Sequence, residues 1–236
     1  MTGSRGFLGL ALVATAIAFG LHAVAGGIRD RGANDTVSVV GSAKQRIESD
    51  VVIWEAFITA QAATTQEAAK QLDGWTASMT AFIDNQGITE DELTVTPIST
   101  EPIYSGPQNK LTGYRLSRSF RVRSTRVDEV VASIEASAEL VRTGIPVTTA
   151  PPQFIYTKLA ELRPALSAEA TKNALSRART VVETAGQKLG KLRDISVGPL
   201  DVTPPDSADA GGFGSYDTST RTKDVTSIVN VTFSVE

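Results

Sequence analysis

Apolar residues recur along the chain with two spacings, which change from segment to segment. A period of two predicts strands, and spacings of three and four predict helices. The longest helical pattern covers residues 159–190. We expect its regular part to begin near Arg163, because Pro164 is tolerated in a first turn but would kink a helix interior. Gly186 is expected to weaken this helix and Gly190 to end it.

One face of this long helix is predicted to pack closely on a sheet, because its side chains are small or apolar. The face consists of Ala170, Ala174, Ala178, Val181, Val182, Ala185 and Leu189.

Two shorter helices are predicted ahead of it. Thr64 has the position of an N-cap, and Glu67 three residues later completes a capping box. That helix is expected to stop at Gly87. The other helix is expected to be capped by one of the hydroxyl residues at 124–125 and closed by Gly144.

Apolar runs predict strands at residues 37–41, 51–62, 93–104, 111–123, 153–157, 194–202 and 225–235. The run at 51–62 is apolar on both faces, so we expect it to be covered on both sides. Residues 93–104 and 111–123 are expected to form a hairpin whose first strand lies at an edge or is bulged, since it contains two prolines.

Together these elements predict an α+β fold. We expect one mixed, mostly antiparallel sheet of about seven strands with three helices, in the order ββαββαβαββ. A hydrophobic helix is expected to precede it at the N-terminus.

The N-terminal segment has the features of an export signal. Arg5 precedes an uncharged, mostly apolar run at residues 7–21, and the small-x-small sequence Ala23-Val24-Ala25 follows. This arrangement is typical of a secretory signal peptide. Extended to Ile28, the run also reaches the roughly 20 residues that cross a bilayer. Both alternatives place the rest of the chain outside the cytoplasm, in the periplasm or on the outer face of the cytoplasmic membrane.

Three segments follow from these patterns. Residues 1–28 are expected to be a signal peptide or an N-terminal membrane anchor, residues 29–35 a linker, and residues 36–236 one α+β domain. Within that domain, residues 203–222 are rich in Pro, Gly, Ser, Asp and Thr, and about twenty residues is long for a loop in a compact domain. This stretch is either a lid or contact loop, or plain disorder.

Composition removes several classes of chemistry. The 236-residue chain has no cysteine, so disulfides, thiolate nucleophiles and zinc–thiolate sites are excluded. Its single histidine, His22, lies in the N-terminal apolar segment, which excludes Ser–His–Asp triads and zinc sites built on several histidines. A net charge of −3 argues against a nucleic-acid binder. We expect no catalytic residue, no metal and no cofactor.

The predicted strand at 111–123 carries Arg115, Arg121 and Arg123 on the face opposite its apolar residues. With Lys110 they are the candidate contact for an anion or a partner. The face is either an anion-binding surface or a solvated or partner-facing side of the strand. The densest acidic cluster, residues 90–92, lies in a predicted solvated loop, which argues against a hydrolase that uses carboxylates alone.

Several stretches, in this order, resemble one known family. They are residues 37–43, Asp50 with the apolar run after it, residues 87–88, Thr96, Tyr104, residues 113–117, and then Ala165, Ala170, Asn173-Ala174, Arg177-Ala178 and Gly186 before residues 189–190. In these stretches the sequence is similar to the SIMPL-domain family of bacterial cell-envelope proteins, and the similarity covers roughly residues 36–236. The resemblance implies an α+β protein that assembles into ring-like homo-oligomers in the envelope and has no established catalytic residues. It also implies links to envelope or oxidative stress.

Two functions are therefore predicted. The first is a non-enzymatic extracytoplasmic protein that self-associates and supports envelope integrity or oxidative-stress tolerance. An uncleaved N-terminal segment would attach it to the membrane. The alternative is a binder of anionic glycans or lipid head groups through the arginine-bearing strand face.

Overall fold

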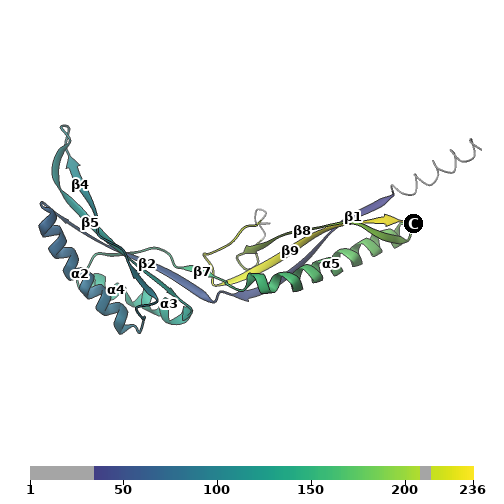
Figure 1. The fold of residues 1–236 in the computed structure, drawn as a ribbon, viewed down its shortest axis with the longest axis horizontal. Coiled ribbons are helices and arrows are strands. Elements are labelled where there is room, and N and C mark those ends of the chain that lie inside the picture. Colours follow the sequence, from purple (N-terminus) through teal and green to yellow (C-terminus); the bar gives the residue numbers. More distant parts are fainter. Residues whose placement is uncertain (1–34, 208–213) are drawn as a thin grey trace, which may run out of the picture. The chain divides into compact units, whose positions relative to one another are not determined.

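The computed structural model of the protein describes residues 35–207 and 214–236. In chain order its elements are β1 (Thr36–Glu48), β2 (Val51–Ala62), α2 (Thr65–Asn85), β3 (Leu93–Val95), β4 (Ser99–Ser105), β5 (Lys110–Ser124), α3 (Val127–Ala136), α4 (Ala138–Arg142), β6 (Val147–Thr149), β7 (Gln153–Ile155), α5 (Leu159–Thr184), β8 (Leu189–Thr203) and β9 (Thr222–Val235) (Figure 1). The α+β class is confirmed. The strands form one sheet of three strands and one of six, so the prediction of a single sheet is wrong.

The predicted element order needs three corrections. The strand expected at 93–104 is divided into β3 and β4, the second short helix is divided into α3 and α4, and β6 is an additional strand. Each added element is short, with three residues in β3 and β6 and five in α4. Short elements of this kind have too few residues to show a period.

The N-terminal segment at residues 1–28, predicted to be a signal peptide or an anchor, lies outside the described residues. So does the predicted linker, apart from Asp35. Within residues 35–207 and 214–236, no helix is long and apolar enough to span a bilayer.

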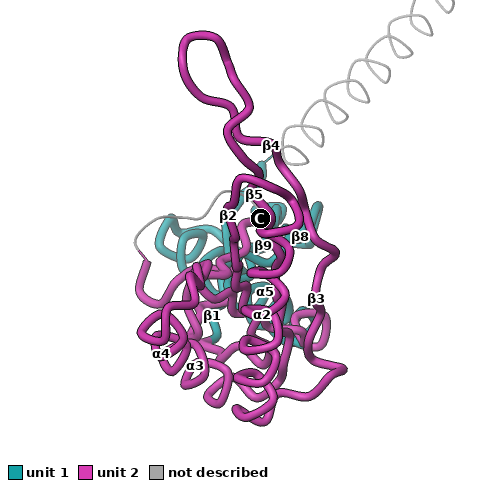
Figure 2. The backbone as a smooth tube through the Cα atoms, turned by 90° about the vertical axis from the view of Figure 1, so that its left-hand side faces the viewer, with its two compact units in different colours: residues 1–45, 162–201, 226–236 teal, residues 46–161, 202–225 magenta. Residues whose placement is uncertain are grey.

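The described residues group into two compact units (Figure 2). Of these residues, unit 1 comprises 35–45 together with Leu162–Asp201 and Thr226–Glu236. Unit 2 comprises Arg46–Glu161 and Val202–Val225.

Unit 2 is built on an antiparallel sheet whose central pair is β2 and β5. β3 and β4 pair with β5, and β6 and β7 pair with β2. The helices α2 and α3 pack on one face of this sheet (Figure 1). That face of β2 is buried at Val52, Trp54, Ala56, Ile58 and Ala60. On its other face Phe57 is 37% exposed, so the prediction that this strand is covered on both sides is wrong at that position.

The predicted hairpin is confirmed. Tyr104 at the end of β4 pairs with Leu111 near the start of β5. The chain between β3 and β4 contains Pro97, which has no N–H to donate to a ladder, and this explains the interruption. β4 pairs only with β5 among the described strands, as expected for an edge strand, and a bulge interrupts its register.

α2 begins and ends as predicted. Thr64 is its N-cap, and the Thr64 hydroxyl accepts a hydrogen bond of 3.3 Å from the Glu67 N–H. Gly87 follows the helix with a φ of 76°, the left-handed conformation that a terminating glycine adopts. The N-cap predicted for the next helix is wrong, because α3 begins after Arg126 without a side-chain cap. The Ser124 hydroxyl accepts instead from the Arg126 N–H, only two residues on.

Unit 1 is a three-stranded sheet in the order β1-β9-β8, with α5 packed on one face (Figure 1). The core between them joins three alanines of α5 to apolar residues of β9: Ala170, Ala174 and Ala178 with Val229, Val231 and Phe233. Gly41 of β1 lies so close to α5 that a Cβ there would overlap the carbonyl of Ala170 and the side chain of Ala174. The prediction of a closely packed alanine face is therefore confirmed for these turns of the helix.

α5 differs from its prediction at its start. It begins at Leu159, and Pro164 therefore lies inside the helix rather than in its first turn. Pro164 has no N–H to donate to the Ala160 carbonyl, so α5 lacks one i→i−4 hydrogen bond in its second turn.

The end of α5 also differs. Gly186 has a φ of 76° and terminates the helix, so it is not a weak point in its interior. Gly190 lies in β8, where a Cβ would collide with the Ser234 side chain. The helix ends at Thr184, before Ala185 and Leu189, and Val181 is exposed although it lies within the helix, so the predicted apolar face is shorter than expected.

Candidate functional site

The predicted contact residues are all exposed on unit 2: Lys110, Arg115, Arg121 and Arg123. Two of them pair with acids on neighbouring strands. Arg121 Nε lies 2.9 Å from Glu55 Oε1, and Arg115 Nη1 lies 3.6 Å from Glu101 Oε2. Cross-strand acids therefore compensate half of the positive charge on this arginine-bearing face, which weakens it as an anion site.

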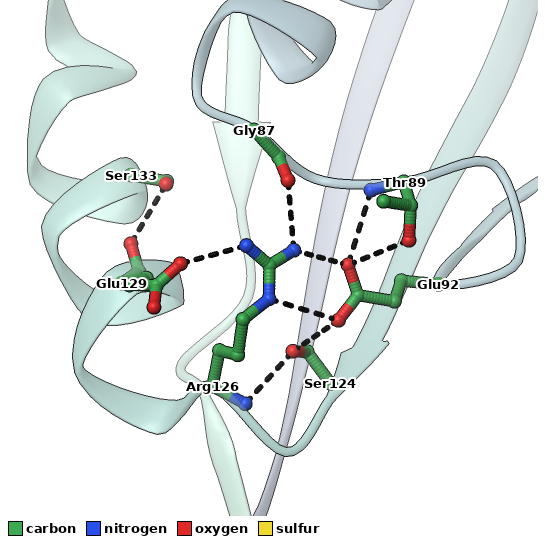
Figure 3. Close-up of polar contacts among 7 residues, drawn as sticks. All are labelled: Gly87, Thr89, Glu92, Ser124, Arg126, Glu129 and Ser133. Atoms are coloured by element: carbon green, nitrogen blue, oxygen red, sulfur yellow. Dashed lines mark hydrogen bonds and ion pairs between the residues drawn. The ribbon is translucent and has the colours of Figure 1, made fainter.

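A polar network joins the loop before β3 to the start of α3 (Figure 3). Arg126 Nη2 donates to Glu92 Oε2 at 2.5 Å and to the Gly87 carbonyl at 2.8 Å, and Arg126 Nη1 donates to Glu129 Oε2 at 2.7 Å. The Ser124 hydroxyl donates to Glu92 Oε1 at 2.5 Å. One guanidinium thus connects the end of α2, the loop before β3 and the first turn of α3.

These contacts keep Glu92 ionised. The hydrogen bond from Arg126 is the main cause that lowers the pKa of Glu92 to about 2, assisted by Ser124 and Thr89 and opposed by burial. The same bond raises the pKa of the Arg126 guanidinium. A carboxylate with so low a pKa is a poor general acid or base near neutral pH. Of the acidic cluster at 90–92, Glu92 therefore has a structural role.

The stretch predicted as a lid, contact loop or disordered segment at 203–222 is bonded to the rest of unit 2 where it is described. The Tyr216 hydroxyl accepts from the Tyr156 N–H at 2.8 Å and donates to the Tyr156 carbonyl at 3.1 Å. Residues 208–213 lie outside the described part. These bonds hold the described residues of this stretch to unit 2, which argues against plain disorder for that part.

A buried ion pair that was not predicted from the sequence joins the end of this stretch to β9. Lys223 is fully buried, and its Nζ lies 3.0 Å from Asp217 Oδ2 and also donates to the Thr220 carbonyl. Burial would raise the pKa of Asp217, but hydrogen bonds from Thr220, Ser219 and Lys223 hold it well below its usual value. A usable sequence signal was the position of Lys223 directly before an apolar strand.

Two side chains of α5 bond to backbone groups of β1, an edge strand of the unit 1 sheet. Arg177 Nη1 donates to the Val40 carbonyl at 3.1 Å. The Ser42 N–H donates to Asn173 Oδ1 at 3.3 Å. Val40 and Ser42 are two residues apart, so their backbone groups point to the same side of the strand. Asn173 and Arg177 therefore occupy that edge.

The opposite edge of this sheet is β8, which has β9 as its neighbour. Every residue from 191 to 197 is exposed. Three of them are apolar: Leu192 at 53%, Ile195 at 43% and Val197 at 49% exposure. We call this stretch the β8 edge. An exposed apolar edge strand offers its backbone N–H and C=O groups to another strand.

Acidic side chains are dispersed over the described residues. Across residues 35–207 and 214–236, no group of three or more acidic or histidine side chains could hold a metal ion. Buried or partly buried acids such as Glu92, Asp217 and Asp224 are committed to ion pairs.

Comparison with known proteins gives a family and two relatives. The profile of SIMPL, a protein of unknown function (DUF541), matches residues 37–233. The 26 kDa periplasmic immunogenic proteins of Brucella melitensis biotype 1 and Brucella abortus strain S19 are each 26% identical to the chain over 173 residues. The match covers 68% of this chain and 65% of each relative, just under two thirds of their length.

Two solved structures from Listeria innocua show a weak likeness. A hydrolase has a TM-score of 0.19 at 12% identity, and the alignment covers 82% of this chain and 91% of the hydrolase. An uncharacterized conserved protein has a TM-score of 0.20 at 10% identity, with 82% and 92% covered. Scores this low carry no argument about fold or activity.

Proposed function

The chain belongs to the SIMPL family, whose profile spans residues 37–233, and we propose that it is a non-enzymatic extracytoplasmic protein that works by self-association and supports envelope integrity or oxidative-stress tolerance. The relatives in Brucella are named periplasmic proteins, which supports a location outside the cytoplasm. Residues 7–28 would either direct export and be removed, or hold the protein at the outer face of the membrane. The part of the proposal with a geometric basis is self-association.

The observation that carries it is the β8 edge. Pairing β8 with the β8 strand of a second copy, antiparallel about a two-fold axis, would satisfy the unpaired backbone groups of both strands. Side chains alternate along a strand, so Ile195 and Val197 share one face of β8 and Leu192 lies on the other. Pairing would partly cover these side chains, on both faces, with the neighbouring strand of the second copy. Two-fold contacts of this isologous kind are the commonest in homo-oligomers.

The opposite edge of the same sheet is a poorer partner. Asn173 and Arg177 already bond the backbone of β1 at Ser42 and Val40. A strand that approached β1 would have to displace both side chains. Substitutions on the β8 edge therefore test the proposed interface, and substitutions beside the β1 edge serve as the matched control.

Sedimentation velocity of the full chain, at concentrations from about 1 to 100 μM, tests the proposal. We expect a dimer or a larger assembly, and we expect the double variant Leu192→Lys/Val197→Lys to dissociate, since lysines on an edge strand oppose pairing. The control is Val40→Lys/Val181→Lys, which places the same charges at exposed apolar positions beside the β1 edge. It should leave assembly unchanged.

A wild-type chain that stays monomeric over this range would refute self-association. An assembly that the two lysines on β8 leave intact would refute the β8 edge as its interface. Equal dissociation by both double variants would point to net charge rather than to strand pairing, and would count against the proposed contact.

A further inference from the structure

Unit 2 contains a cleft of about 540 Å³ whose lining includes none of the residues of the arginine-bearing face. This volume lies in the range of small-molecule sites. Its walls come from the β1–β2 turn, the start of α3, the segment before α5 and the residue before β9. The residues that matter for its chemistry are Ser49, Asp50, Asp128, Glu129, Lys158 and Arg221.

The carboxylates of the cleft already have partners. Asp50 accepts from the Thr157 N–H at 2.8 Å and from the Thr157 hydroxyl at 2.7 Å. The other two acids bind arginines of the same cleft: Asp128 with Arg221, and Glu129 with Arg126. Acceptor groups in these walls are therefore largely satisfied by the protein itself.

Several hydrogen-bond donors in the same walls, in contrast, have no acceptor in the described part of the chain. Ser49 is 5% exposed, and its hydroxyl has no hydrogen-bond partner among the described residues. The buried Arg221 Nε likewise has no partner in that part of the chain. α3, ten residues long, begins in the wall without a side-chain cap, so its first N–H groups have no intrahelical acceptor. Lys158 adds an exposed ammonium.

We propose that this cleft binds a small oxyanion, a ligand with a carboxylate or phosphate group. Its oxygens accept hydrogen bonds from the Ser49 hydroxyl, the Lys158 ammonium and the first turn of α3. Such a ligand supplies the acceptors that these walls lack, and a helix N-terminus favours negative charge. The site lies within unit 2 and does not depend on assembly through the β8 edge.

Isothermal titration calorimetry of the full chain, with inorganic phosphate and with succinate at constant ionic strength, tests this site. We expect at least one of the two to bind saturably, and the stronger probe identifies the preferred group. Lys158→Glu should weaken that binding at least about tenfold, because it replaces a cation by an anion at the wall. Lys70→Glu makes the same charge change at an exposed position on α2, outside both the cleft and the arginine-bearing face, and should leave the affinity unaltered.

Ser49→Ala gives a second, independent readout. It should weaken binding by about threefold to tenfold, the worth of one hydrogen bond. It should not destabilise the free protein, because the hydroxyl loses no partner.

Absence of saturable binding of both probes up to about 20 mM would overturn the proposal, since weaker affinities have no plausible specificity. So would equal losses from Lys158→Glu and Lys70→Glu, which would show attraction to net charge alone. Undiminished binding by Ser49→Ala would remove the buried hydroxyl from the site and refute the geometry as stated.

Discussion

The guanidinium of Arg126 holds the Glu92 carboxylate with two nitrogens, Nη2 at 2.5 Å from Oε2 and Nε at 3.4 Å from Oε1. The Glu92 side chain is only 14% exposed. Glu92 directly precedes β3 and Arg126 directly precedes α3, so one ion pair fixes the approach to two elements. Because Glu92 is mostly shielded from water, its loss leaves the Arg126 guanidinium with only the exposed Glu129 as a counter-charge.

Glu92→Gln should therefore lower the free energy of unfolding of unit 2 by roughly 2–3 kcal/mol. Urea denaturation followed by tryptophan fluorescence measures it, because both tryptophans of the chain, Trp54 and Trp75, lie in unit 2. Glu90→Gln is the control: the residue is exposed in the same loop, and its change should stay within about 0.5 kcal/mol. Similar losses in both variants would contradict the special role of Glu92.

The same pair should make unit 2 sensitive to acid. The pKa of Glu92 is lowered from 4.5 to about 2 in the folded protein, so the unfolded chain takes up the proton first as the pH falls. The contribution of Glu92 to stability is then fully present above about pH 5 and is lost between about pH 5 and pH 2. Urea titrations at several pH values should show the difference between wild type and Glu92→Gln shrinking across this window. A difference that stays constant would exclude the ion pair as its source.

Gly41→Ala should destabilise unit 1 by roughly 2–3 kcal/mol, because the added Cβ would overlap α5 at Ala170 and Ala174. Hydrogen exchange of the α5 amides reports the effect, since unit 1 has no tryptophan. Gly74→Ala is the matched control in α2, where an added Cβ meets nothing within 4 Å. It should stabilise by about 0.5–1 kcal/mol, as alanine is the better helix former.

Asp217→Ala should cost about 3–5 kcal/mol, because it leaves the buried Lys223 ammonium without its counter-charge. Tryptophan fluorescence in urea is again the measurement. The double variant Asp217→Ala/Lys223→Met should recover part of the loss, since methionine needs no charged partner. A double variant less stable than Asp217→Ala would show that Lys223 has a different role.

Neutralising the arginine-bearing face by Arg115→Gln/Arg121→Gln/Arg123→Gln should change stability by no more than about 1 kcal/mol, because exposed ion pairs contribute little. Wild-type binding to anionic lipid vesicles should be weak and should fade as salt approaches about 0.15 M. Tight binding at that salt concentration, abolished in the triple variant, would instead support the alternative function predicted from the sequence. Vesicle flotation at two salt concentrations distinguishes these results.

Local signals in the sequence predicted local structure well. The cap at Thr64, its partner Glu67 and the stop at Gly87 lie within one helix, and each acts through the backbone beside it. The same holds for the hairpin turn between Tyr104 and Leu111. These features need no knowledge of distant residues.

The division into two sheets could not be predicted in this way. β1 and β2 adjoin in sequence, yet β1 pairs with β9 while β2 pairs with β5. Apolar periodicity shows which face of a strand is buried but does not identify its partner. The predicted end of α5 was wrong for a related reason. A glycine inside a helix and a glycine that terminates one look the same in sequence, and only the φ angle of Gly186 shows that it terminates α5.

The candidate sites show the same difference between local features, which the sequence predicts, and contacts between distant segments, which it does not. The exposure of Arg121 followed from the alternation of β5, but its pairing with Glu55 required the register between β2 and β5. The cleft at Ser49 joins segments that are distant in the chain, so no spacing rule pointed to it.

The hydrogen bonds from Asn173 and Arg177 to the backbone of β1 affect whether the unit 1 sheet could grow by adding strands from other copies. A sheet that accepts strands at both margins can lengthen without limit, the geometry of amyloid. In unit 1, Asn173 and Arg177 bond to backbone groups of the β1 edge. A dimer formed through the two β8 edges would therefore have a β1 edge of this kind at each end of its joined sheet. Such a dimer resists the addition of further strands, so β8 could form an interface between two copies without starting a fibril.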